Sequence, residues 1–151
     1  MSARPTFPAA FQCYKPLSER VYGCICMSPY NTILLVKGRR THKWSFPKGH
    51  RIGCESYLEC ARRETLEETG VDLTGQIPVA YHKLSVGEYF FFEVEEELDT
   101  QIRDAREVME TSWVSIEKMR SMKCNVDVNK FLQHMRRSGF PTDRIESTAW
   151  R

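Results

Sequence analysis

Residues 49–71 read GHRIGCESYLECARRETLEETGV. This stretch carries the signals for both ends of a helix. Ser56 and Glu59 have the spacing of a capping box, which satisfies free backbone N–H groups at the start of a helix. Gly70 stands where a residue in the left-handed conformation commonly ends one. We therefore predict a helix over residues 57–69.

The predicted helix carries three glutamates on one face. Glu64, Glu67 and Glu68 recur at i, i+3 and i+4, so their side chains are neighbours. Like charges at this spacing repel each other, and a purely structural helix has little reason to keep them. A bound cation turns this repulsion into ligation, and oxygen ligands favour a hard ion, Mg2+ or Mn2+.

The same helix has a second face that is suited to packing. We expect this face to lie on a sheet while the carboxylate face meets solvent and metal. Its members are Leu58, Ala61, Thr65 and Thr69.

Gly49, Glu55 and the run from Arg63 to Val71 together resemble the Nudix box, GX5EX7REUXEEXGU. Thr65 is the one departure, at a position that is usually aliphatic. The resemblance implies an α/β protein, a Nudix-type α/β/α sandwich with a mixed sheet between helices. It also implies a pyrophosphohydrolase that cleaves nucleoside diphosphates linked to another group.

The resemblance assigns roles within the box. It implies that Glu64, Glu67 and Glu68 ligate the metal, with one of them a candidate for the general base, and that Arg63 orients a box carboxylate. Glu55 would lie roughly opposite Glu64 if the helix extended to it, so we expect a structural or indirect role there.

Three further assignments accompany the box. Gly49 permits the turn into it and Gly70 the helix end, so their roles concern backbone shape. A carboxylate from outside the box often completes Nudix sites. Glu107 is the first choice for it, followed by Glu110 and Glu93, and each of these, taken singly, is better explained as a solvated acidic residue.

Basic residues gather just before and inside the box. A solvated loop and a phosphate-binding loop both explain such a run. For the second case we predict substrate binding by Arg39, Arg40, Lys43, Trp44 and Lys48. Trp44, Tyr30 and Tyr81 are candidates for stacking a base, or else core and surface filler, and Lys130, Arg136 and Arg137 are candidates for holding an RNA strand.

The segment from Trp44 to Gly49, together with Glu59 to Ala61, resembles the box entry of mRNA-decapping Nudix enzymes. This implies cleavage of the 5′ cap of capped RNA, with release of a methylated guanosine diphosphate. Related entries occur in hydrolases of dinucleoside polyphosphates and of diphosphoinositol polyphosphates, which remain alternatives. A catalytically silent, nucleotide-sensing Nudix module is the alternative from another class, and the intact glutamate set argues against it.

The whole chain of 151 residues suits one domain. With 41% hydrophobic and 28% charged residues it has a globular composition, and a net charge of +2 does not mark a general nucleic-acid binder. We expect an irregular arm over 1–19, a Nudix domain over 20–137 and a mobile tail over 138–151.

Other elements follow from periodicity and turn signals. We predict strands over 20–27 and 32–36 as a hairpin, an extended 44–47, strands over 79–86 and 88–94, an irregular 95–109, a strand over 113–115, a helical turn over 116–122 and a helix over 126–136. The run 89–92 alternates poorly, which fits a strand covered on both faces.

The sequence also bears on the protein's surroundings. No apolar run is long enough to span a bilayer, and the first residues lack the apolar core of a signal peptide, although a signal removed earlier remains an alternative. The six cysteines have no zinc-ligand spacing. We therefore expect reduced thiols, a cytoplasmic location, no membrane association and no obligate protein partner.

Overall fold

The structure, a computed structural model, describes residues 20–138. The predicted arm over 1–19 and the tail beyond Ser138 lie outside the described residues. The elements are β1 (Val21–Met27), β2 (Thr32–Gly38), β3 (Trp44–Ser45), β4 (Lys48–Gly49), α2 (Tyr57–Thr69), β5 (Ala80–Lys83), β6 (Gly87–Glu93), β7 (Val108–Ser115), α3 (Ile116–Met119) and α4 (Val126–Ser138).

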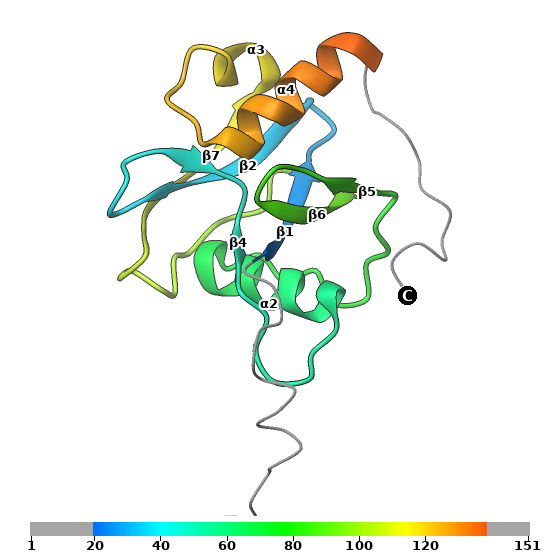
Figure 1. Ribbon diagram of the computed structural model, residues 1–151, viewed down its shortest axis with the longest axis vertical. Coiled ribbons are helices and arrows are strands. Elements are labelled where there is room, and N and C mark those ends of the chain that lie inside the picture. Colours follow the sequence, from blue (N-terminus) through cyan, green and yellow to red (C-terminus); the bar gives the residue numbers. More distant parts are fainter. Residues whose placement is uncertain (1–19, 139–151) are drawn as a thin grey trace, which may run out of the picture.

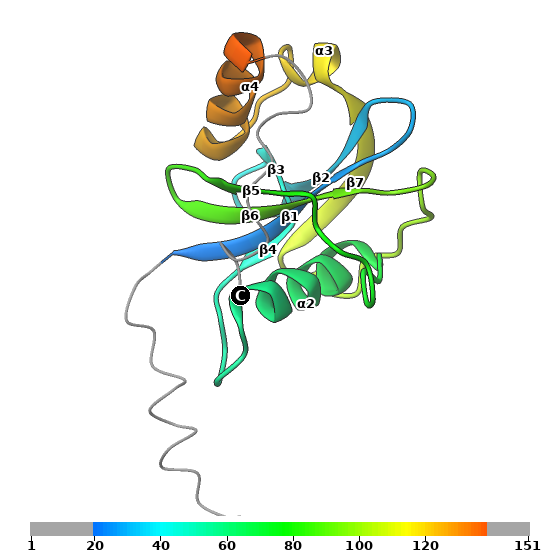
Figure 2. The same cartoon turned by 90° about the vertical axis from the view of Figure 1, so that its right-hand side faces the viewer.

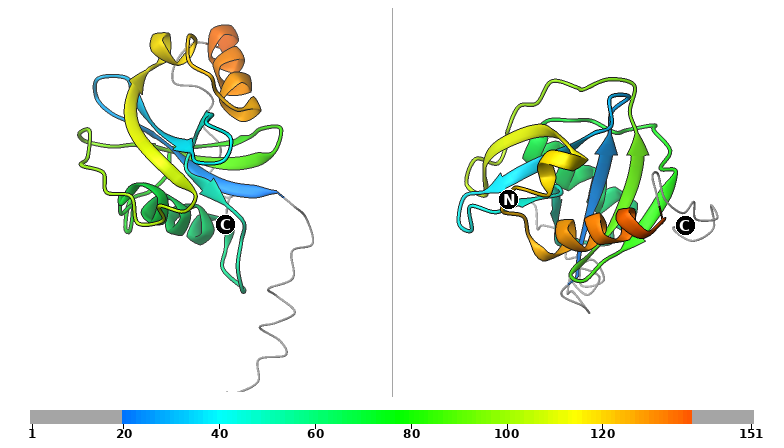
Figure 3. Two further views of the ribbon diagram at one scale, coloured as in Figure 1. Left: turned by 90° about the vertical axis from the view of Figure 1, so that its left-hand side faces the viewer. Right: turned by 90° about the horizontal axis from the view of Figure 1, so that it is seen from above.

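Three layers make up this part of the chain. A seven-stranded mixed sheet lies between α2 on one side and α3 with α4 on the other (Figures 1 and 2). Seen from above, α4 crosses over the strands of the sheet (Figure 3). The expected α/β/α sandwich is therefore confirmed.

The strand order is β3-β2-β1-β6-β5, with β4 paired to β1 and β7 paired to β2. β1 and β6 run parallel, from Val21 opposite Gly87 to Met27 opposite Glu93. The predicted hairpin of β1 and β2 is confirmed as antiparallel, but its Cα register is limited to Met27 opposite Ile33. Both strands pair more extensively elsewhere: β1 pairs with β6, and β2 pairs with β7 over its whole length.

Two hydrophobic clusters fill the spaces between the layers. On β6, Tyr89 and Phe91 belong to the cluster beneath α4, whereas Phe90 and Phe92 belong to the cluster above α2. All four are at most 1% exposed, so a strand covered on both faces is confirmed.

α2 has the predicted bounds and both predicted caps. The Ser56 hydroxyl accepts a hydrogen bond from Glu59 N at 3.0 Å, and the Glu59 carboxylate accepts one from Ser56 N at 2.7 Å. Gly70 ends the helix with φ 78°, and its N–H donates to Leu66 O at 2.8 Å. Ala61, Thr65 and the rest of the predicted packing face lie on the sheet.

Several boundaries differ from the sequence predictions. β7 begins at Val108 and not at 113, because it pairs with β2 from Val108 opposite Gly38 to Ser115 opposite Thr32. The helical turn after it ends at Met119, and the last helix continues to Ser138. β5 is limited to residues 80–83, since the chain turns at Ser85 and Val86 into β6.

The cysteines within residues 20–138 divide into two groups. Cys24, Cys26, Cys60 and Cys124 are free and buried. Cys54 is disulfide-bonded, so the expectation of six reduced thiols is wrong at this position. Pairing requires only that two Cβ atoms approach in space, and sequence spacing does not reveal this. Within residues 20–138, no helix combines the length and apolarity needed to cross a membrane.

Candidate active site

Glu64 and Glu68 lie on the side of α2 that faces β4. Their exposed fractions are 8% and 4%, so the expectation that the whole carboxylate face meets solvent is wrong. Lys48 N donates to Glu68 Oε1 at 3.2 Å. A Cβ atom added to Gly49 would collide with the Glu64 carboxyl group. Glycine at this position therefore makes room for a catalytic candidate, in addition to shaping the chain.

Arg63 joins the other carboxylates of the box. Its Nη2 donates to Glu55 Oε1 at 2.7 Å, and its Nη1 donates to Glu64 Oε2 and to Glu67 at 3.2 Å. The guanidinium also bonds to the His50 carbonyl at 3.0 Å, which fixes the loop before the helix. Hydrogen bonding to Glu55 raises the pKa of Arg63. Arg63 thus contacts three carboxylates, as an orienting role requires.

Burial changes the acidity of both inward-facing glutamates. Removal from water raises the pKa of Glu64 to about 7, with Arg63 opposing the shift. Burial likewise raises the pKa of Glu68 to about 8, with Lys48 opposing it. Negative charge on Glu107 adds to both shifts, which shows that Glu107 is near both groups. The site therefore brings acidic side chains together, but burial disfavours their ionised form.

Glu107 reaches this position through a loop that is fastened to α2 and to β2. Arg103 N and Asp104 N both donate to the Glu67 carbonyl, at 3.0 and 2.9 Å. Arg39 N donates to the Glu107 carbonyl at 2.8 Å, and Arg39 Nε donates to Ala105 O at 2.8 Å.

The two other candidates for the carboxylate outside the box lie elsewhere. Glu110 lies on β7, opposite Lys37 of β2. Glu93 lies at the end of β6, opposite Met27 of β1. Glu107 alone of the three lines the cleft described below and acts on the buried glutamates. The structure therefore favours the first choice among the three.

The donor set suits a divalent metal, although its members do not converge in this structure. Among residues 20–138, no three His, Cys, Asp or Glu side chains are grouped closely enough to hold a metal ion. Glu67 is turned toward Arg63, and its side chain is 43% exposed and therefore has room to move. Carboxylate oxygens from Glu64, Glu68 and Glu107 have the chemistry that Mg2+ and Mn2+ prefer.

A cleft of about 630 Å³ extends from Lys48 and Glu107, and we call it the basic cleft. Four of its side chains are cationic: Arg40, Lys43, Lys48 and Arg106. Such a wall suits a ligand with several phosphates. The complete lining is Gly38, Arg40, Thr41, Lys43, Ser45, Lys48, Val86, Arg106, Glu107, Asn125 and Val126.

Two predicted substrate-binding residues do not line the basic cleft. Trp44 packs against the core beneath α4, with Lys37 Nζ 6.0 Å from its ring centroid. Arg39 holds the loop that carries Glu107. Of the other stacking candidates, Tyr30 is 74% exposed in the turn after β1, and Tyr81 lies on β5. No aromatic residue lines the basic cleft in the described part of the chain.

Sequence reasoning missed several residues of the basic cleft. Arg106 adjoins the predicted Glu107, and its position in the run of residues 103–107 was the signal that could have found it. Asn125, Val86 and Val126 carried no signal, because they come from two distant segments that meet only in the fold.

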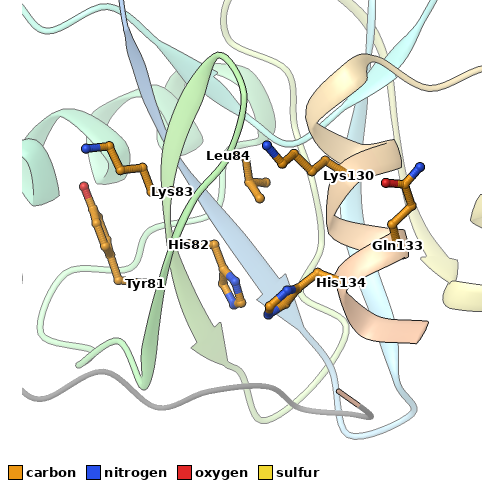
Figure 4. A pocket seen from close by; sticks show the side chains of 7 residues that line it. All are labelled: Tyr81, His82, Lys83, Leu84, Lys130, Gln133 and His134. Carbon is orange, nitrogen blue, oxygen red and sulfur yellow. The ribbon is translucent and has the colours of Figure 1, made fainter. Parts of the chain in front are cut away.

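A second cavity, of about 280 Å³, lies between β5 and α4, and we call it the edge cavity. Figure 4 shows His82 facing His134, with ring centroids 5.9 Å apart, while Tyr81 and Lys83 leave β5 on its opposite side. Among residues 20–138, its lining contains no carboxylate: Tyr81, His82, Lys83, Leu84, Lys130, Gln133 and His134. The oxygen ligands expected of the hydrolytic site are therefore absent there.

Comparison with known families matches residues 17–135 to the NUDIX domain. The bis(5′-nucleosyl)-tetraphosphatase of Sus scrofa is 31% identical over 112 residues, which are 67% of this chain and 75% of that protein. The mRNA-decapping enzyme subunit 2 of Arabidopsis thaliana is 38% identical over 65 residues, which are 43% of this chain and only 17% of that protein.

Among solved structures, the chain is similar to an Ap4A hydrolase of C. elegans. The TM-score is 0.64 at 20% identity, and the match covers 78% of this chain and 94% of that one. At this identity the likeness concerns the fold.

Proposed function

Because the chain belongs to the Nudix family of pyrophosphohydrolases, we propose that it removes the 5′ cap of mRNA and releases a methylated guanosine diphosphate. The observation that carries this proposal is the basic cleft, which is lined by four cationic side chains and Glu107 and is joined to the box by the Lys48 N–H bond to Glu68. A cap offers a triphosphate bridge to these cations and continues as a polyanionic strand.

The similarity to a decapping subunit lends further support. The matched region is short, at 65 residues. It agrees with the sequence resemblance between residues 44–49 and the box entry of decapping enzymes. The chain spans a small part of that relative, so the comparison supports the chemistry more than the biological setting.

Each residue of the site has a task in the proposed reaction. Glu64, Glu67 and Glu68, completed by Glu107, would hold Mg2+ or Mn2+. A bound divalent ion neutralises phosphate charge and increases the acidity of water. One of the glutamates accepts the proton of the attacking water, and Arg63 keeps the carboxylates in position through its hydrogen bonds.

The cationic wall performs the binding step. Arg40, Lys43 and Lys48 bind and orient the phosphates, so that the bond to be broken lies beside the carboxylates. Water adds its oxygen to phosphorus, the anhydride bond breaks, and the leaving phosphate departs with its bonding electrons.

Two other substrate classes remain alternatives. A dinucleoside tetraphosphate is favoured by the Sus scrofa relative, whose match covers more of this chain than that of the decapping subunit. A diphosphoinositol polyphosphate is favoured by the dense positive charge of the basic cleft and by the absence of a lining aromatic ring among the described residues.

One experiment separates these classes. Cap-labelled RNA, a free cap dinucleotide, a dinucleoside tetraphosphate, ADP-ribose and a diphosphoinositol phosphate are incubated side by side with Mg2+ or Mn2+, and the products are identified. We expect fastest turnover of capped RNA. Efficient turnover of the inositol compound with negligible release from capped RNA would replace the proposal. Tight binding to one compound without turnover of any would favour a nucleotide sensor.

A further inference from the structure

Val86 and Val126 form an exposed apolar surface on the wall of the basic cleft. Their exposed fractions are 46% and 53%, and neither belongs to the hydrophobic clusters of the core. Val86 lies in the turn between β5 and β6, and Val126 is the first residue of α4. These two valines therefore meet only because the turn lies against the start of the last helix.

Asp127 fixes this arrangement. Its carboxylate is fully buried and accepts hydrogen bonds from Val86 N at 2.9 Å, from Gly87 N at 2.8 Å and from the Tyr89 hydroxyl at 2.7 Å. Three donors satisfy a buried carboxylate well, so the turn is held rigidly on α4. The apolar surface is thus preorganised and does not depend on loop motion.

The local fold does not require valine at either place. A β-branched residue is poorly suited to a turn, and an exposed valine gains little from burial in the native state. Single exposed apolar residues are common and need no explanation. These two differ because they share one cleft wall with Arg40, Lys43 and Lys48.

We infer that Val86 and Val126 form the subsite for the nucleobase of the substrate. This inference rests on the proposed function and deepens it. A ligand of the basic cleft must offer phosphates to the cations and an uncharged flat face to the valines, and a nucleotide offers both. A diphosphoinositol polyphosphate carries phosphates around its whole ring and has no comparable face.

The chemistry of this subsite limits its selectivity. Aliphatic side chains contact a base through its area, whereas an aromatic ring adds attraction for a positively charged methylated guanine. No aromatic residue lines the basic cleft among residues 20–138. Methylation of the guanine should therefore change affinity by less than about threefold, well below the gain expected of an aromatic cage.

Binding measurements without metal test the subsite separately from catalysis. The affinities of guanosine diphosphate and of inorganic pyrophosphate are compared for the wild type and for the double variant Val86→Ser/Val126→Ser. We expect the wild type to prefer the nucleotide, and the double variant to lose about tenfold in nucleotide affinity, in line with the loss of buried apolar area. Pyrophosphate affinity should stay unchanged.

Two further variants serve as controls. Ile77→Ser changes a more exposed apolar residue that does not line the basic cleft, and it should leave both affinities unchanged. If the double serine variant fails to fold, Val86→Thr/Val126→Thr keeps the shape and tests the polarity.

Equal affinity of the wild type for the two ligands would overturn the inference. Unchanged nucleotide affinity in the folded valine variants would do the same. Failure of the proposed function would be distinct, because it would appear as absence of turnover with the nucleotide preference intact.

Discussion

The basic cleft and the edge cavity are both lined by cationic side chains and both border α4, yet only one of them adjoins carboxylates. The basic cleft ends at Glu107 and at Lys48, whose backbone N–H bonds to Glu68. The edge cavity has Lys83 and Lys130 but no acidic residue in the lining that the described part of the chain provides. Positive charge can bind phosphates at either place, but among residues 20–138 only the basic cleft adjoins carboxylates that could hold a metal ion.

The largest expected effect is a loss of turnover when a glutamate beside the basic cleft is substituted. Glu67→Gln and Glu68→Gln should each lower turnover by at least about 100-fold, because each removes a charged oxygen ligand or the general base. Neither should unfold the protein, since Glu67 is 43% exposed and burial already favours the neutral form of Glu68, which glutamine resembles. Initial rates and thermal unfolding of the purified variants check both statements.

Lys130→Ala in the edge cavity is the matched control for activity on a short substrate. Its turnover of a free cap dinucleotide should equal that of the wild type, because the described residues place no carboxylate in that cavity. Full activity of both glutamine variants would disprove the assignment of the metal site. Unfolding of either variant would point to a structural role for the glutamates.

The helix that carries these glutamates was predictable because its signals are local. Ser56, Glu59 and Gly70 define both ends of α2 within a few residues of each other. The burial of Glu64 was not predictable, since it depends on how β4 lies across the helix. Local chemistry thus located the site, whereas its surroundings required the fold.

Long-range pairing explains the other differences. β2 pairs with β7 across about 75 residues, and this pairing brings Arg39 to the Glu107 loop. The aromatic Trp44 gave no sign of whether it faces substrate or core, because both environments favour aromatic residues. Val86 and Val126 belong to no motif at all, so sequence alone could not connect them.

Asp127 holds the turn that carries Val86 of the basic cleft, and its substitution provides the next largest effect. Asp127→Ala should lower the free energy of unfolding by about 2–4 kcal/mol, because three donors lose their buried acceptor. Urea unfolding measures this loss. Asp99→Ala, at an exposed position, should change stability by less than about 0.5 kcal/mol. Equal effects of the two substitutions would contradict the fastening role of Asp127.

The free energy of unfolding should also depend on pH, because two buried glutamates near the basic cleft titrate. The folded pKa values of Glu64 and Glu68, about 7 and about 8, lie above the unfolded value near 4.5. Between these values the folded state binds more protons, so the free energy of unfolding falls as pH rises. We expect a loss of at least about 1.4 kcal/mol from pH 4.5 to 8.5, the equivalent of one pKa unit.

Urea unfolding in the presence of a chelator measures this dependence, since a bound metal would oppose it. Glu64→Gln/Glu68→Gln should flatten the profile, because the substituted side chains do not titrate. Stability that rises over the same interval in the wild type would contradict the assigned pKa directions. A flat profile in the wild type would mean that both carboxylates ionise freely in the folded state.

The smallest expected effect asks whether the edge cavity contributes to binding. Lys130 lies one helical turn beyond Val126 on α4, so a strand leaving the basic cleft along this helix would meet it. Lys130→Glu should weaken binding of a long capped RNA by about threefold to tenfold and reduce the salt slope by about one, as expected for one phosphate contact.

Lys118→Glu, on α3, is a matched charge reversal outside both cavities and should change neither quantity. Fluorescence anisotropy over a salt series provides both values. An unchanged slope in Lys130→Glu would confine phosphate binding to the basic cleft, whereas impaired turnover of the free cap dinucleotide would show that the two cavities act as one site.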